Sequence, residues 1–222
     1  IKDTARVLSR YLDGIMIRTY GHERIEELAR WADVPVINAL SDLLHPCQAL
    51  TDLLTIREHK GRLAGLKMAY VGDGNNMTHS LMYAAAKVGM HFAAATPAGY
   101  EPNEKVVQNA RADASETGAS VTLTHDPKEA VRDADVVVTD TWASMGQEEE
   151  HDARTAVFRP YQVNPELLAA ADARAVVMHC LPAYRNEEIT ADVFESFANV
   201  IFDEAENRLH VQKAIMALVM GG

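Results

Sequence analysis

Side chains able to bind a small polar molecule stand directly after several apolar runs in this sequence. Arg18 ends one such run, and His45, Pro46 and Gln48 follow the next. A guanidinium at a strand end can bind an oxyanion or polarise a carbonyl group. Pro46 suits the first position of a helix, and a helix start with His and Gln can hold a phosphorylated or carbonyl-bearing molecule. Taken alone, a surface ion pair for Arg18 and an ordinary hydrogen-bonded turn for His45 are the simpler interpretations.

A glycine turn joins another apolar run to a helical pattern. Its residues, Gly72-Asp73-Gly74-Asn75-Asn76, form half of a dinucleotide-binding fingerprint. The third glycine would fall at Met77, and no acidic residue stands near Thr96, where the ribose-binding acid is expected. A nicotinamide-dependent oxidoreductase is therefore a weaker alternative. A turn that presents Asn76 and free backbone amides at a helix start suits a carboxylate better than a pyrophosphate.

An acid and a thiol follow the last two apolar runs. Asp140, which could pair with an ammonium, comes directly before a turn containing Ser144 and Met145, and Cys180 and Leu181 follow the final run. A lone cysteine is usually inert packing, but this one is expected at the same sheet edge as Asp140. A metal site is the weaker interpretation, because the nine histidines and two cysteines show no HxxxH or CxxC spacing.

These residues need a sheet that brings separate strand ends together. Continuous apolar strands that alternate with helical patterns are typical of a parallel sheet covered on both faces. We therefore predict an α/β fold with a doubly wound parallel sheet, whose ligands bind at the carboxyl ends of the strands. The predicted strands are 14–18, 34–38, 66–71, 91–96, 120–124, 135–139 and 175–179, and the predicted helices are 23–31, 48–60, 78–88, 103–117, 126–131 and 165–171.

The helical stretch after Pro46 suggests a domain boundary. Residues 1–44 are too few for a core of their own and are predicted to be the end of a domain, followed by a joining helix over 45–60. Residues 61–204 are predicted to form the second domain, and 205–222 a C-terminal helix that returns toward the first. The chain opens with Ile1 and not Met, so we expect it to start inside a longer protein.

Composition excludes several classes of function. The 222 residues carry a net charge of −11, which lacks the positive field that nucleic-acid binding requires. No apolar stretch approaches the roughly 20 residues of a membrane span, and no signal peptide opens the chain. Two cysteines far apart in sequence are typical of reduced thiols, so we expect a cytoplasmic protein without nucleic-acid or membrane partners.

Together these motifs resemble the aspartate/ornithine carbamoyltransferase family, and its ornithine branch in particular. The resemblance covers essentially the whole chain. It implies that 1–44 ends a carbamoyl-phosphate domain and that 61–204 is a Rossmann-like ornithine-binding domain. The segments that carry it are His45-Pro46-Cys47-Gln48, Asp73-Gly74-Asn75-Asn76, Asp140-Thr141-Trp142-Ala143-Ser144-Met145-Gly146, His179-Cys180-Leu181-Pro182 and Glu204-Ala205-Glu206-Asn207-Arg208.

The resemblance also implies roles for individual residues. Carbamoyl phosphate would be bound by Arg18, His45, Gln48, Cys180, Leu181 and Arg208, of which Arg18, His45 and Cys180 would be catalytic. Ornithine would be bound by Asn76, Asp140, Ser144 and Met145. No metal or organic cofactor is implied, and the family's sites lie between subunits of a trimer, so a homotrimer or a multiple of trimers is expected. The family's phosphate-binding motif, Ser-x-Arg-Thr-Arg, is absent here, so this chain alone is expected to be inactive.

The implied reaction is transfer of the carbamoyl group of carbamoyl phosphate to the δ-amine of L-ornithine, which gives L-citrulline and phosphate. It would serve arginine biosynthesis or the arginine deiminase pathway. We expect Cys180 to help position the neutral amine, although a covalent carbamoyl-cysteine is a second hypothesis. A non-catalytic ligand-binding or regulatory fragment is the alternative from another class.

Overall fold

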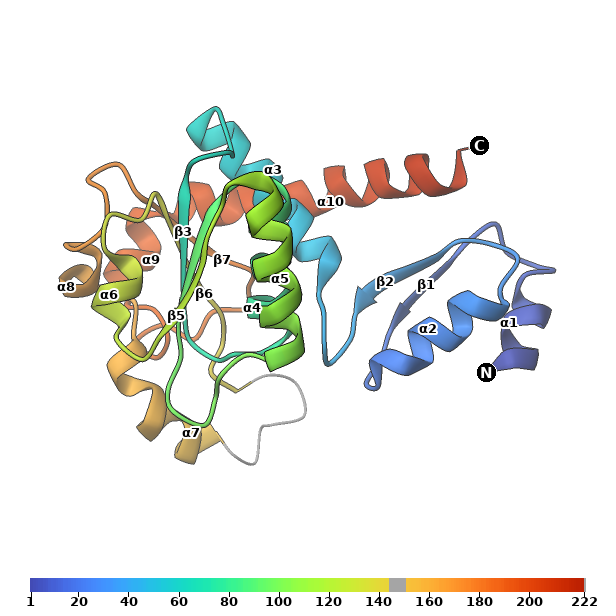
Figure 1. Ribbon diagram of the computed structural model, residues 1–222, viewed down its shortest axis with the longest axis horizontal. Coiled ribbons are helices and arrows are strands. Elements are labelled where there is room, and N and C mark those ends of the chain that lie inside the picture. The colour runs from blue at the N-terminus through green and yellow to red at the C-terminus, as the bar shows by residue number, and fades with distance from the viewer. Residues whose placement is uncertain (144–150, 222) are drawn as a thin grey trace.

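Seven parallel strands form two sheets in the computed structural model, which describes residues 1–143 and 151–221. The strands are β1 (Ile15–Arg18), β2 (Val36–Leu40), β3 (Lys67–Val71), β4 (His91–Ala95), β5 (Val121–Thr124), β6 (Val136–Thr139) and β7 (Val176–His179). The larger sheet has the order β5-β4-β3-β6-β7, and β1 pairs with β2 in a separate two-stranded sheet (Figure 1). The doubly wound parallel α/β fold predicted from the sequence is confirmed.

Helices connect these strands and cover the larger sheet. They are α1 (Lys2–Leu8), α2 (His22–Trp31), α3 (Pro46–Lys60), α4 (Asn76–Lys87), α5 (Glu104–Thr117), α6 (Pro127–Val131), α7 (His151–Phe158), the 3-10 helix η2 (Arg159–Tyr161), α8 (Pro165–Leu168), α9 (Ala191–Ser196) and α10 (Ala198–Met220). None of the helices within the described ranges is both long and apolar enough to cross a membrane.

The central strand β3 has a buried face on each side of the sheet. Met68 and Tyr70 pack into a cluster with α3, α4 and α5, whereas Ala69 and Val71 pack into a second cluster with α6, α8 and α9. Successive side chains of a strand point to opposite faces, so a continuous apolar run is what a doubly covered strand requires. The two helix layers therefore fix where the end of β3 lies.

The long helix α3 begins and ends where its sequence indicates. Pro46 occupies its first turn and Gly61, with φ of 74°, ends it in the left-handed conformation that glycine adopts most easily. Asn207 of α10 donates to Thr55 of α3 at 3.0 Å, and Figure 1 shows α10 running past α3 toward the two-stranded sheet. These two helices, distant in sequence, form one packed unit beside the larger sheet.

The first part of the chain has a small core of its own, so the expectation that residues 1–44 are too few to form one is wrong. Ala5, Ile15 and Leu28 form its buried centre, between α1, α2 and the two-stranded sheet. β2 starts two residues later than predicted, because Pro35 has no N–H to donate to a neighbouring strand. α10 starts at Ala198, ahead of the predicted position 205. The division of the chain into domains at these points stays a prediction.

Candidate active site

A crevice of about 640 Å³ lies at the carboxyl ends of β3, β6 and β7, and the ends of β1 and β2 face it. The chain leaves β3 toward β4 on one side, while β6 and β7 lie on the other, so this is the topological switch point at which open α/β sheets bind ligands. Seven of the residues predicted from the sequence line it: Arg18, His45, Asn76, Asp140, Cys180, Leu181 and Arg208.

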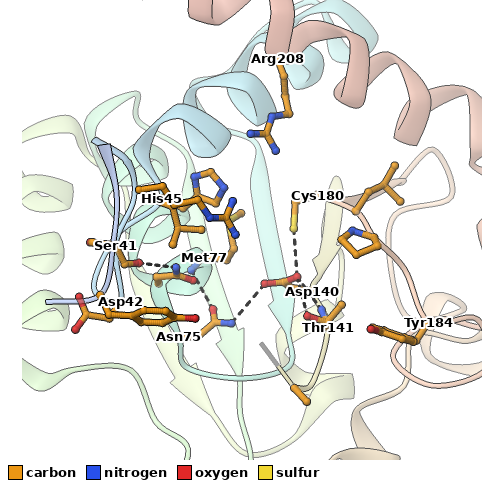
Figure 2. A pocket seen from close by; sticks show the side chains of 17 residues that line it. Ser41, Asp42, His45, Asn75, Met77, Asp140, Thr141, Cys180, Tyr184 and Arg208 are labelled. Atoms are coloured by element: carbon orange, nitrogen blue, oxygen red, sulfur yellow. Dashed lines mark hydrogen bonds between the residues drawn. The ribbon is translucent and has the colours of Figure 1, made fainter. Parts of the chain in front are cut away.

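One wall of the crevice carries the cationic groups. Arg18 stands at the end of β1, His45 is the residue before the first turn of α3, and Arg208 projects from α10 (Figure 2). The backbone N–H of His45 donates to the hydroxyl of Ser80 at 2.7 Å, which fixes the start of α3 against α4. Burial, reinforced by the positive charges of Arg208 and Arg18, lowers the pKa of His45 to about 4. The imidazole is therefore neutral at pH 7 between two guanidinium groups.

The opposite wall carries the acid and the thiol. Cys180 donates its S–H to Oδ1 of Asp140 across 3.2 Å, and the backbone N–H of Thr141 donates to the same oxygen at 2.7 Å (Figure 2). The other oxygen accepts from the side-chain amide of Asn75 at 3.4 Å. Burial and the charge of Asp140 raise the pKa of Cys180 well above its usual value. Cys180 is thus a protonated thiol beside a carboxylate.

The start of α4 differs from the sequence-based expectation. Oδ1 of Asn75 accepts from the backbone N–H groups of Met77 and Thr78 at 3.0 and 3.3 Å. The sequence predicted free amides at this helix start, and for these two amides that prediction is wrong. Asn76 lines the crevice and donates its side-chain amide to the carbonyl of Ser41 at 2.7 Å. Asn75, which sequence reasoning missed, is both the helix cap and a partner of Asp140. Its position next to Asn76 at the end of a strand was the available signal.

A buried hydrogen bond between His179 and Glu188 supports the turn that contains Leu181. His179 is within 2.9 Å of Glu188 through Nε2, and its Nδ1 accepts from the backbone N–H of Leu181 at 2.9 Å. These two contacts together require that Nε2 carries the hydrogen. Leu181 has φ of 56°, a conformation that a branched residue adopts only where its surroundings hold it. The ring of His179 therefore fixes the backbone of Leu181 at the crevice.

Of the predicted residues that the structure describes, Gln48 does not line the crevice. Gln48 is fully buried, and its side-chain amide donates to Asp52 and Glu204 at 2.8 and 2.9 Å. Ser144 and Met145 lie outside the described residues. Sequence reasoning did not single out Asp52 or the carboxyl group of Glu204. For Asp52 the available signal was a carboxylate one helical turn after Gln48.

The arrangement has a definite chemical character. Two guanidinium groups and a neutral imidazole share one crevice with a carboxylate and a thiol. Among residues 1–143 and 151–221, no group of three or more His, Cys, Asp or Glu side chains could hold a metal ion. Fold and site together define a doubly wound α/β protein with a crevice at its switch point, where cationic groups stand on one side and a carboxylate with a thiol on the other.

The chain belongs to the aspartate/ornithine carbamoyltransferase family. Residues 1–58 match the carbamoyl-P binding domain of that family, and residues 64–219 match its Asp/Orn binding domain. The two matches together span nearly the whole chain. The family predicted from the motifs is therefore confirmed, and the nicotinamide-dependent oxidoreductase is not the class to which this chain belongs.

Close relatives and solved structures agree with the family match. The ornithine carbamoyltransferase of Carboxydothermus hydrogenoformans is 62% identical over 221 residues, which cover 100% of this chain and 71% of the relative. The structure of the Pyrococcus furiosus ornithine carbamoyltransferase superposes with a TM-score of 0.96 at 58% identity and covers 100% of this chain and 71% of its own. That of the Gloeobacter violaceus enzyme gives a TM-score of 0.92 at 53% identity, covering 99% and 74%.

Proposed function

We propose that this protein transfers the carbamoyl group of carbamoyl phosphate to the δ-amine of L-ornithine and so forms L-citrulline and phosphate. The observation that carries the proposal is the pairing of Asp140 with Cys180 across one crevice from Arg18, His45 and Arg208. An acid and guanidinium groups in one crevice suit an amino acid with two amines that binds beside a phosphorylated donor. The names of the relatives support ornithine as that amino acid.

The donor would occupy the cationic wall. Arg18 and Arg208 would bind phosphate and carbonyl oxygens of carbamoyl phosphate, and neutral His45 would donate one N–H to the carbonyl oxygen. Leu181, whose backbone is held by His179, would contribute its carbonyl beside the reacting carbon. Gln48 would offer its side-chain oxygen to the carbamoyl amide, since that atom has no hydrogen-bond partner among the described residues.

The acceptor would occupy the wall of Asp140. Its carboxylate, with Ser144, would bind the α-ammonium of ornithine, and Asn76 with the backbone amide of Met145 would bind the α-carboxylate. The neutral δ-nitrogen then attacks the carbonyl carbon, the new C–N bond forms, and the bond from carbon to the phosphate oxygen breaks. The proton that the nitrogen loses in this step passes to the leaving phosphate, which departs as hydrogen phosphate. The nitrogen must first lose a proton, so Cys180 in its thiol form would orient the neutral amine and would not attack carbon itself. Holding both reactants together and stabilising the oxyanion supply the acceleration.

A direct assay of the full-length protein tests the proposed reaction. Citrulline should form from carbamoyl phosphate and ornithine, whereas aspartate and putrescine in place of ornithine should give at most about one hundredth of that rate. Faster carbamoylation of aspartate or putrescine, or binding of both ligands without turnover, would contradict the proposal. The second result would favour a non-catalytic binding protein.

We also propose a cytoplasmic homotrimer, or a multiple of trimers, that serves arginine biosynthesis. One relative, that of Pyrococcus furiosus, is named an anabolic ornithine carbamoyltransferase, and this name supports the biosynthetic direction over the arginine deiminase pathway. Deletion of the gene should then make growth depend on added arginine or citrulline. Light scattering should give a mass that is a multiple of three protomers.

A further inference from the structure

Three buried polar side chains lie directly behind the crevice, between α3, α10 and the end of β7. Gln48 and Asp52 stand one turn apart on α3, and Glu204 faces them from α10. Gln48 and Asp52 are 0% exposed and Glu204 is 1% exposed. Buried polar groups are expensive unless their hydrogen bonds are made, so their partners indicate what the cluster holds in place.

The amide of Gln48 is fixed in one rotation. Its Nε2 donates to Oδ1 of Asp52 at 2.8 Å and to Oε1 of Glu204 at 2.9 Å. An amide nitrogen has two hydrogens, so both are used in these bonds. Turning the amide over would bring its oxygen against two carboxyl oxygens. The pair of acids therefore determines which atom of Gln48 is left for a ligand.

Glu204 also holds the strand end on the other side of the crevice. Its Oε2 accepts from the backbone N–H of His179 at 3.0 Å, and His179 is the residue directly before Cys180. On its own helix, Arg208 follows Glu204 by about one turn. A single carboxyl group on α10 thus connects the first turns of α3 with the end of β7.

The two acids carry fewer than two negative charges near neutral pH. Burial raises the pKa of Asp52 to about 7 and raises that of Glu204 well above its usual value. The charged and titratable groups around the pair are Arg208 on α10, Asp140 after β6 and Cys180 after β7. Two adjacent buried carboxylates repel each other, so retention of a proton makes the cluster compatible with burial.

We propose that Glu204, with Asp52 as its partner, is a positioning residue. It keeps the cationic wall of the crevice, which would bind the donor, at a fixed distance from the wall of Asp140 and Cys180, which would bind the amine. It acts through Gln48 on one side and through the backbone of His179 on the other. This inference rests on the proposed carbamoyl transfer, because that reaction gives the two walls their roles. The carboxyl group of Glu204 touches neither substrate.

The two acids differ in what an isosteric amide would do. Both oxygens of Glu204 accept N–H bonds, so in Glu204→Gln an amide nitrogen meets another donor whichever way it turns. Asp52 accepts from Gln48 at Oδ1, and its carboxyl group also hydrogen-bonds with the carboxyl group of Glu204, where the retained proton can lie between the two acids. In Asp52→Asn the new nitrogen can take the Oδ2 position and leave the bond to Gln48 intact. The proposal thus predicts damage at one position and tolerance at the other.

Steady-state kinetics of the full-length protein test this asymmetry. Glu204→Gln should raise KM for carbamoyl phosphate and lower kcat/KM for ornithine by about tenfold or more, because Gln48 or the backbone N–H of His179 loses its buried acceptor. Asp52→Asn should stay within about threefold of the wild type. Glu206→Gln, which removes a carboxylate from the exposed face of the same helix, is the matched control and should leave both constants unchanged. A merely structural role would lower the folded fraction without a change in KM.

Alkylation of Cys180 by iodoacetamide, measured by mass spectrometry at pH 8, is a readout that needs no turnover. Glu204→Gln removes the acceptor of the backbone N–H of His179 and so frees the strand end that carries Cys180, and the rate should increase by about threefold or more. Asp52→Asn and Glu206→Gln should change this alkylation rate less.

If the wild type forms no citrulline but this pattern of alkylation rates appears, the proposed function fails and the positioning role stands. If citrulline forms and Glu204→Gln matches the wild type in both assays, or Asp52→Asn loses as much as Glu204→Gln, the positioning role is overturned.

Discussion

The thiol of Cys180 lies 3.2 Å from Oδ1 of Asp140, at the ends of the neighbouring parallel strands β7 and β6. The carboxylate accepts the S–H hydrogen and, together with burial, raises the pKa of the thiol well above its usual value. A thiolate, and not a thiol, is the nucleophilic form of cysteine. This contact therefore favours an orienting role for Cys180 over covalent catalysis.

We predict that Cys180 forms no carbamoyl adduct. The full-length protein, incubated with carbamoyl phosphate alone at pH 7, should show an unchanged mass for the peptide that contains Cys180. Cys180→Ser should keep measurable turnover, since a hydroxyl can still donate to Asp140. A stable mass increase on Cys180 that is chased into citrulline by ornithine would establish the covalent route instead.

Asp140→Asn should weaken the use of ornithine selectively. Loss of a charged hydrogen bond of about 1.5–3 kcal/mol corresponds to a decrease of about 10- to 100-fold in kcat/KM for ornithine. KM for carbamoyl phosphate should change little, because the cations lie on the other wall. Asp113→Asn on α5 is the control, since Asp113 pairs with Lys87 and does not line the crevice. Equal losses for both substrates would argue against an ammonium partner for Asp140.

The meeting of Asp140 and Cys180 could be predicted because both follow apolar runs. In a parallel sheet every such strand ends at the same edge, so residues forty positions apart come together without any knowledge of side-chain packing. The same reasoning placed Arg18 and His45 on that edge. These predictions depend only on the period of the strands and on the direction of the chain.

The direction of Gln48 could not be predicted, because it depends on a helix 156 positions further along the chain. Helical periodicity predicts on which face of the helix Gln48 lies. It does not predict whether that face lines a crevice or packs against Glu204. The cap of α4 was missed for a different reason. Whether Asn75 or Asn76 caps the helix depends on where the first turn starts, and sequence patterns locate helix ends only to within one or two residues.

The low pKa of His45 should appear in the pH dependence of stability. The folded-state pKa is about 4, below the usual 6.5, so the unfolded chain binds a proton between these values and the folded protein does not. Stability therefore decreases as the pH falls from 6.5 toward 4, by on the order of 3 kcal/mol for this group. His45→Gln should lack this component, measured as the difference between variant and wild type in urea unfolding at pH 4 to 7. Parallel curves for the two proteins would contradict the assignment.

Substitution of Arg154 should lower the free energy of unfolding more than most other single substitutions. It pairs with Asp73 and donates to the carbonyl of Trp142, with its side chain 4% and that of Asp73 10% exposed. Arg154→Met leaves Asp73 buried without this cation and should lower the free energy of unfolding by about 3–5 kcal/mol. Adding Asp73→Asn should restore part of that loss, whereas Arg159→Met at the surface should be nearly neutral. A double variant no more stable than Arg154→Met would show that the pair itself matters little.

The rate of carbamoyl transfer should increase with pH up to the pKa of the attacking amine. An alkyl amine has a pKa of about 10, and only its neutral form can attack carbon, so kcat/KM for ornithine should rise about tenfold per pH unit from pH 6 to 9. Neither of the two groups nearest the reaction should interrupt this rise, since His45 is already neutral and Cys180 stays protonated over most of the range. The buried carboxyl group of Asp52, with a pKa of about 7, does titrate within this range, but it lies behind the crevice and touches neither substrate. Asp52→Asn should therefore show the same slope as the wild type, and a flat profile in both proteins would exclude amine deprotonation as the controlling step.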